Sequence, residues 1–166
     1  MRVRLAGISA FVIAALALPA GPARAADALT GNMQPFSYLL GAPWNCSTSV
    51  PAMAGQPART DQGTATFEVV PGNVVHNHVS TPNYAGDFYF GYSTRMSTFW
   101  QADADSMGGY SFMTSTDGKA YTGTSSMGPM NSPATVTYAK VSDSKVTVHE
   151  VLSGSMPVTF DSVCTR

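Results

Sequence analysis

Hydrophobic and polar residues alternate over most of the chain, in short segments separated by turn-forming residues. After residue 41, hardly any window repeats with the 3.6-residue period of a helix. A period of two, which places successive side chains on opposite faces of a strand, recurs instead. Pro71-Gly72-Asn73 and Thr116-Asp117-Gly118 interrupt this pattern and are typical of turns between paired strands. The pattern therefore predicts nine or ten short antiparallel strands, preceded by a short helical turn over Phe36–Leu40.

The alternation also predicts which face of each strand is buried. Phe88 and Phe90 share one such face, Trp100 lies on that of the next strand, and Phe112 on that of the strand after it. Large aromatic residues assigned to the interior in this way are Trp44, Phe67, Phe88, Phe90, Tyr92, Trp100, Tyr110, Phe112, Tyr121, Tyr138 and Phe160. Aromatic side chains of this number either fill the interior completely or surround one small ligand, and both outcomes stay open.

The first 25 residues have the features of a secretory signal peptide. Arg2 and Arg4 precede an apolar run that ends near Leu18, and Ala23-Arg24-Ala25 forms a cleavage signature. We therefore predict a signal peptide over 1–25, a flexible leader over 26–35 and a single domain over 36–166. The expected location is the periplasm or the extracellular medium.

Two cysteines, Cys46 and Cys164, lie near the two ends of the predicted domain. In an oxidising compartment such a pair is expected to form a disulfide. Because a disulfide requires Cα atoms within about 7 Å, the first and last strands should be neighbours. A chain of hairpins whose end strands meet is an antiparallel up-and-down β-barrel. A two-sheet β-sandwich is the alternative, since it also brings the end strands together.

The net charge of the predicted domain limits the kinds of partner that it is expected to bind. Loss of residues 1–25 removes three of the nine basic residues and none of the ten acidic ones, which leaves 141 residues with a net charge of −4. An acidic domain of this kind is not expected to bind nucleic acid. No later apolar run approaches the 18 residues of a membrane span, so no transmembrane segment is expected after signal cleavage. The oligomeric state stays open.

The segment Phe36-x-x-Leu39-Leu40-Gly41-x-x-Trp44-x-Cys46 resembles the opening of lipocalin-like (calycin) barrels, in which a short helix leads into Gly-x-Trp. Here two residues separate Gly41 from Trp44, where one is usual. The resemblance extends to small bacterial lipocalin-like domains of unknown function and to the haem-binding nitrobindins. It implies a barrel with an internal site for a small molecule. The nitrobindins use a His near the C-terminus, but 156–166 contains none, so haem is not the expected cofactor.

His76-Asn77-His78 is the most specific local feature for metal chemistry. Residues i and i+2 of a strand project from one face, so both imidazoles could bind a transition metal if a third ligand joined them. An ordinary polar outer face explains the same pattern, with Val75, Asn77 and Val79 inside. His149 lies on an outward phase and could join the pair only there. The expectation is therefore no cofactor, with a transition metal at His76 and His78 as the alternative.

Glu150 follows Val146 and Val148 on one face of its strand, and an inward carboxylate there would orient a ligand or act as a general base. An outward position at the end of the strand is the alternative. The sequence favours a binding protein for a small hydrophobic or amphipathic molecule over an enzyme. The residues expected to contact this molecule are Trp44, Phe90, Trp100, Phe112, Tyr138 and Glu150. Two alternatives stay open: a metal-dependent or acid–base enzyme using His76 and His78 or Glu150, and a structural envelope protein with a solid core.

Overall fold

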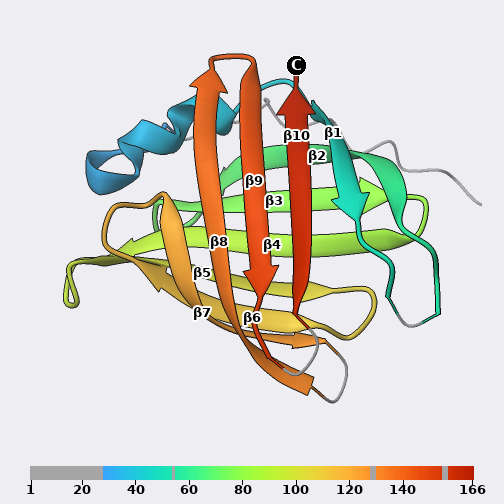
Figure 1. The fold of residues 1–166 in the computed structure, drawn as a ribbon. Coiled ribbons are helices and arrows are strands. Elements are labelled where there is room, and N and C mark those ends of the chain that lie inside the picture. Colours follow the sequence, from blue (N-terminus) through green and yellow to red (C-terminus); the bar gives the residue numbers. More distant parts are fainter. Residues whose placement is uncertain (1–27, 54, 128–129, 155–156) are drawn as a thin grey trace, which may run out of the picture.

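Ten strands follow one short helix in the computed structural model, which describes residues 28–53, 55–127, 130–154 and 157–166 (Figure 1). The predicted signal peptide over 1–25 lies outside these residues. The helix is the 3-10 helix η1 (Gly31–Leu39). The strands are β1 (Trp44–Val50), β2 (Arg59–Val70), β3 (Val74–Thr81), β4 (Tyr84–Ser93), β5 (Thr98–Asp105), β6 (Tyr110–Ser115), β7 (Ala120–Met127), β8 (Met130–Ser142), β9 (Lys145–Leu152) and β10 (Val158–Thr165). No helix in the described part of the chain is long and apolar enough to span a membrane.

Each strand pairs antiparallel with the next one along the chain, and β10 returns to pair with β1, so the sheet closes into a barrel. Cys46 lies directly opposite Cys164 in this last pairing, with their Cα atoms 4.0 Å apart, and the two form a disulfide. The closed up-and-down barrel is confirmed, and the alternative β-sandwich is excluded. Closure also removes the unpaired sheet edges that an open sheet of these strands would expose.

Local sequence explains the hairpins. At the turn between β6 and β7, the Asp117 carboxylate accepts hydrogen bonds from the backbone N–H groups of Lys119 and Ala120 and from the Ser115 hydroxyl. Gly118 follows with a φ of +70°, a conformation that glycine adopts without steric cost. The hydrogen bonds of the Asp117 side chain and the positive φ of Gly118 thus both favour the turn that the sequence predicts here.

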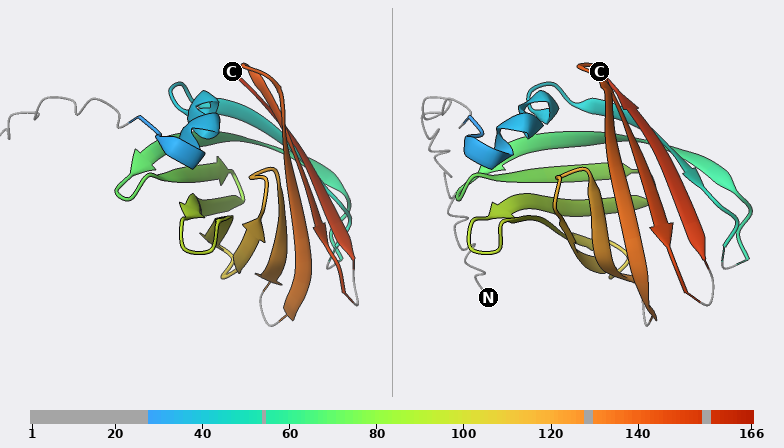
Figure 2. Two further views of the ribbon diagram at one scale, coloured as in Figure 1. Left: turned by 90° about the vertical axis from the view of Figure 1, so that its left-hand side faces the viewer. Right: turned by 60° about the vertical axis from the view of Figure 1, so that its left-hand side comes forward.

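The helix η1 packs across one end of the barrel, on the same side as the C-terminus (Figure 2). Phe36 packs against Phe99 of β5, and the Trp44 indole N–H donates to the carbonyl of Leu39 at 2.9 Å. The Arg166 guanidinium lies over the Trp44 ring, 4.6 Å from its centroid. Trp44 is fully buried as a result, and this end, which we call the closed end, is sealed by side chains.

The helix begins earlier than the sequence predicts. It starts at Gly31 rather than Phe36, and Leu29 and Met33 are buried against the barrel. Residues 29–35 of the expected flexible leader are therefore part of the packed domain. Leu29 and Met33 lie in a stretch too short and too polar to show a helical period, so their burial depends on the apolar end of the barrel that they cover.

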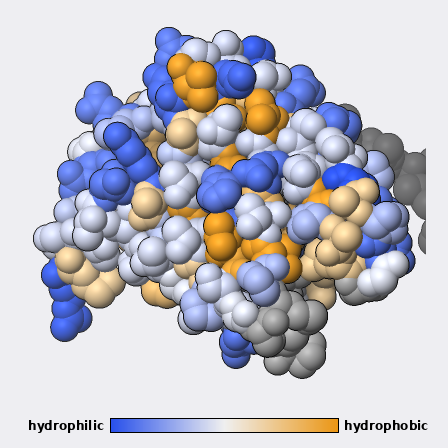
Figure 3. All heavy atoms as spheres, viewed as in Figure 1, coloured by the Kyte–Doolittle hydropathy of each residue, from blue (hydrophilic) through white to orange (hydrophobic). Residues whose placement is uncertain are grey.

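The outer face of β8, β9 and β10 has the polar, weakly charged character that the composition predicts. Figure 3 views this face, which is mostly white to blue with smaller orange areas. Only 11% of all residues are charged, compared with about 25% in typical soluble domains. Threonine side chains take the place of charged ones on the outward positions of these strands, for example Thr135, Thr147 and Thr159.

We predict that replacing both Cys46 and Cys164 with serine destabilises the barrel by about 4–5 kcal/mol, because the disulfide closes a long loop (sequence separation 118) in the unfolded chain. Urea unfolding of the oxidised protein and of the double variant measures this difference. The reduced wild-type protein is the control and should match the variant. Equal stabilities of the oxidised protein and the variant would contradict the prediction.

Candidate functional site

Strand register separates the interior of the barrel from its surface. Phe90 of β4 is buried and pairs with Gln101 of β5, which in turn pairs with buried Met113 of β6. Directly paired residues lie on the same face of a sheet, so all three point inward. One position further from the closed end on the same face, Phe88 pairs with Asp103. Two interior positions of β5, Gln101 and Asp103, are therefore polar.

This register corrects two of the predicted ligand contacts. Phe112 is on the outer face of β6 with 54% of its surface exposed, and Trp100 is on the outer face of β5. The Trp100 ring covers Gly91, where an added Cβ would lie 2.4 Å from it. The prediction that Trp100 and Phe112 line the interior is wrong, because their neighbours Gln101 and Met113 occupy the inward positions. The usual rule places aromatic residues inside and so assigns both strands to the opposite phase.

The other four predicted contacts point inward. Trp44 and Phe90 are buried in the half next to the closed end, where they form part of a packed core. Tyr138 packs edge-on against Phe90, with 5.5 Å between ring centroids. Glu150 pairs with Val136 on one side and Phe160 on the other, and so extends into the interior as expected. Whether these four residues contact a ligand stays a prediction.

The half of the interior opposite η1 contains partly exposed inward side chains. Phe88, Asp103 and Phe160 are partly exposed there, beside buried Asn77 and Leu152. We call this second half of the interior the distal lumen. It is defined by Phe67, Asn77, Phe88, Gln101, Asp103, Ser111, Tyr138, Glu150 and Phe160.

A chain of hydrogen bonds crosses the distal lumen. The Tyr138 hydroxyl of β8 donates to the Gln101 side-chain oxygen at 2.9 Å, and the Gln101 amide donates to Asp103 at 3.4 Å. The Ser111 hydroxyl also donates to the Asp103 carboxylate. The sequence analysis did not identify Gln101, Asp103 or Ser111 as site residues. Their inward direction would have followed from Phe99, which lies on the same face of β5 and packs against Phe36.

Two carboxylates in the distal lumen have raised pKa values. Burial, reinforced by the nearby negative charge of Asp103, raises the pKa of Glu150 to about 7. Burial also raises the pKa of Asp103, although the hydrogen bonds from Ser111 and Gln101 oppose the shift. Among the described residues, no donor lies within hydrogen-bonding distance of the Glu150 carboxylate. Glu150 is therefore a titratable group near neutral pH without a protein partner.

Asn77 of β3 contributes a second unpaired acceptor. Its side chain points inward between Phe67 and Phe88, and only 8% of the residue is exposed. Within the part of the chain that the structure describes, the Asn77 Oδ1 atom has no hydrogen-bond partner. A buried acceptor without a partner lowers the free energy of unfolding by about 1–3 kcal/mol. Asn77 therefore destabilises the fold at this position.

His76 and His78 lie on the outer face of β3, where carboxylates occupy three of their ring nitrogens. His76 contacts Glu68 through Nδ1 at 2.9 Å and Asp87 through Nε2 at 2.8 Å, and His78 Nδ1 contacts Asp87 at 2.9 Å. Burial lowers the pKa of His76, but the bonds to Glu68 and Asp87 outweigh it and raise the pKa overall. A proton on the imidazole competes with a metal ion for the ring nitrogen.

Among the described residues, no group of three or more His, Cys, Asp or Glu side chains has a metal-binding arrangement. His149 is on a different part of the outer surface, on β9, where it contacts Asp161 of β10 at 2.6 Å. It therefore does not join His76 and His78 on β3. Metal binding by His76 and His78 stays a prediction, without a third ligand from His149.

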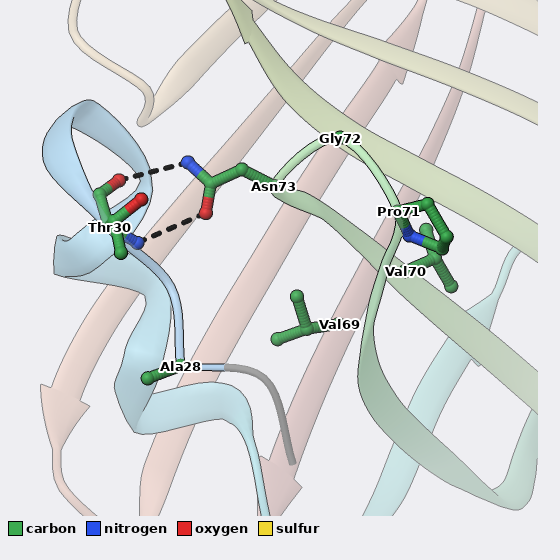
Figure 4. Close-up of a pocket in the computed structure, with 7 residues that line it drawn as sticks. All are labelled: Ala28, Thr30, Val69, Val70, Pro71, Gly72 and Asn73. Atoms are coloured by element: carbon green, nitrogen blue, oxygen red, sulfur yellow. Dashed lines mark hydrogen bonds between the residues drawn. The ribbon is translucent and has the colours of Figure 1, made fainter. Parts of the chain in front are cut away.

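A groove of about 300 Å³ lies between the start of η1 and the turn from β2 to β3 (Figure 4). The Asn73 side chain spans it, accepting a hydrogen bond from the Thr30 N–H at 3.0 Å and donating to the Thr30 carbonyl at 2.9 Å. Both polar atoms of this amide are thus satisfied within the protein. These two hydrogen bonds attach the start of η1 to the turn between β2 and β3. In the distal lumen, by contrast, the Asn77 Oδ1 atom has no partner among the described residues.

The chain has no match among known protein families or among curated proteins.

We predict that Glu150 makes the barrel less stable as pH rises. Its pKa is about 7 in the folded state and about 4.3 in an unfolded chain. The folded state therefore holds the proton more tightly between these values, and stability falls across this range by roughly 3 kcal/mol.

A Glu150→Gln variant should lose this part of the pH dependence. Urea unfolding of both proteins at several values between about pH 4.5 and about pH 7.5 measures it. The difference in stability between the variant and the wild type should grow with pH in favour of the variant. A difference that stays constant would show that Glu150 titrates normally.

Proposed function

We propose that this protein is an exported, lipocalin-like barrel that binds a small amphipathic molecule in the distal lumen. One observation carries the proposal. Asn77 and Glu150 present hydrogen-bond acceptors without partners among the described residues, and they do so beside partly exposed aromatic rings. Ligand sites typically combine an apolar lining with a few polar groups that fix orientation.

The distal lumen provides both parts of such a site. Phe67 and Phe88 on one wall and Phe160 on another supply apolar surface that is not fully buried within the protein. A bound molecule would cover this surface and gain about 25 cal/mol for each Å² of apolar area removed from water. In the half next to the closed end, Trp44 and Phe90 are already buried within the protein.

Export is the second part of the proposal. The Cys46–Cys164 disulfide supports it, since disulfides persist in the periplasm and outside the cell and are rare in the cytosol. Together with the signal-peptide pattern over 1–25, this favours a location beyond the inner membrane. Likeness to the lipocalins is supported by the closed barrel and by the short helix that leads into Trp44.

We predict that Phe88→Ala weakens the binding of a fluorescent apolar dye about tenfold, because it removes an aromatic wall of the distal lumen. Phe112→Ala is the matched control: it makes the same substitution two strands away on the outer face, and dye affinity should not change. Dye titration measures both effects, and urea unfolding shows that each variant is folded. Equal losses of affinity in the two variants would contradict an internal site.

Native mass spectrometry of the freshly purified, untagged protein identifies any molecule that copurifies with it. The proposal expects a small organic species that is absent from Phe88→Ala and retained by Phe112→Ala. Retention by neither variant or by both would place binding outside the distal lumen.

An acid–base enzyme using Glu150 is the second candidate, since a pKa of about 7 suits a general base at neutral pH. A copurified molecule that remains chemically unchanged during incubation with the protein would favour binding over catalysis.

A further inference from the structure

The distal lumen contains hydrogen-bond acceptors without partners among the described residues. The Tyr138 hydroxyl donates to Gln101, and the Gln101 amide and the Ser111 hydroxyl donate to Asp103. These protons are therefore used within the protein. Both oxygens of Glu150 and the Oδ1 atom of Asn77 have no donor among the described residues. A molecule that satisfies them must bring N–H or O–H groups of its own.

We propose that the ligand carries a protonated amine, which Glu150 and Asp103 bind in the distal lumen, while a second donor of the same molecule reaches Asn77. The inference rests on the proposed internal site and specifies the chemical class of its ligand. Both carboxylates point into the barrel from partly exposed positions, and a cation satisfies both their charge and their acceptor capacity.

Aromatic rings accompany both carboxylates. Asp103 pairs directly with Phe88 across β5 and β4, and Glu150 pairs directly with Phe160 across β9 and β10. An ammonium group held between the carboxylates would therefore also lie near the faces or edges of two rings. Cation–π attraction contributes about 0.5–2 kcal/mol when the cation is desolvated, and the same rings pack against the apolar part of the ligand.

Asn77 sets the distance to the second donor. It pairs with Phe88, which pairs with Asp103, so Asn77 and Asp103 are two strands apart on the interior face. Adjacent strands are about 4.8 Å apart, which places the two backbones roughly 10 Å from each other. A molecule with an ammonium group and a second donor separated by an apolar ring or short chain fits this arrangement.

No cation of the protein already fills this role. Arg59 is the one basic residue on the inward phase of the distal half among the described residues, and it lies at the rim with its guanidinium bound to Asp61 at 2.9 Å. The groups that face Glu150 are Tyr138 of β8, Asp103 of β5 and Tyr84 of β4, and β10 contributes Phe160. All of these titratable groups are neutral or negative.

Binding of an amine is coupled to release of a proton. Without a cation, burial favours the protonated form of Glu150 near neutral pH. An ammonium group favours the ionised form, so Glu150 gives up its proton to the solvent as the amine binds. Amine affinity should therefore rise from about pH 5.5 to about pH 8, while the affinity of a neutral analogue should not change.

Isothermal titration calorimetry with 2-phenylethylamine, 2-phenylethanol and phenylacetate tests the inference, since these probes share one ring and differ in the charged group. We expect the amine to bind about tenfold more tightly than the alcohol, and phenylacetate to bind most weakly. Titrations at about pH 6.5 in two buffers of different ionisation enthalpy count the released protons. The wild type should release a fraction of one proton with the amine and none with the alcohol.

Glu150→Gln should reduce amine affinity about tenfold, abolish proton release and reduce alcohol affinity much less than amine affinity. Glu68→Gln is the matched control, because Glu68 is exposed on the outer face of β2, and it should leave amine binding unchanged. Alcohol and amine binding with equal affinity would overturn the amine inference alone. Absence of binding by all three probes, together with equal dye binding by Phe88→Ala and Phe112→Ala, would overturn the internal site itself.

Discussion

Pairing of β1 with β10 is the interaction on which the rest of the structure depends. It places Cys46 opposite Cys164 and converts a row of hairpins into a closed surface with an inside and an outside. Without this pairing, β1 and β10 would each expose an unsatisfied edge, and no interior would exist for the inward residues of the other strands. The disulfide fixes the same contact covalently, which limits how far the two end strands can separate.

The two halves of the closed interior differ in the side chains that they contain. Next to η1, Trp44, Val75 and Met113 are packed almost without solvent contact, and this half supplies the hydrophobic stabilisation of the domain. The distal half contains Asn77, Asp103 and Glu150, which all lose hydration on folding and are only partly compensated by protein partners. Polar groups in such positions reduce the stability of the fold.

Much of the fold could be predicted from the sequence. The strand count, the turns at Pro71-Gly72-Asn73 and Thr116-Asp117-Gly118, and the contact between Cys46 and Cys164 all follow from local patterns or from one covalent constraint. The inward direction of Glu150 followed from its phase with Val146 and Val148. Each of these inferences depends on residues that are near one another in sequence, or on a bond that forces distant ones together.

The candidate site could be predicted only in part, because the face of a strand that points inward depends on residues that are distant in sequence. Trp100 and Phe112 have the aromatic character of interior residues, yet they lie outside, because pairing with β4 places Gln101 and Asp103 opposite the inward Phe90 and Phe88. A period of two shows that two faces differ, but it does not say which face is buried. The sequence by itself thus determined the strands, their turns and the closure of the barrel. Only the tertiary structure decided which side chains line the interior, because the register between neighbouring strands fixes the inward face of each one.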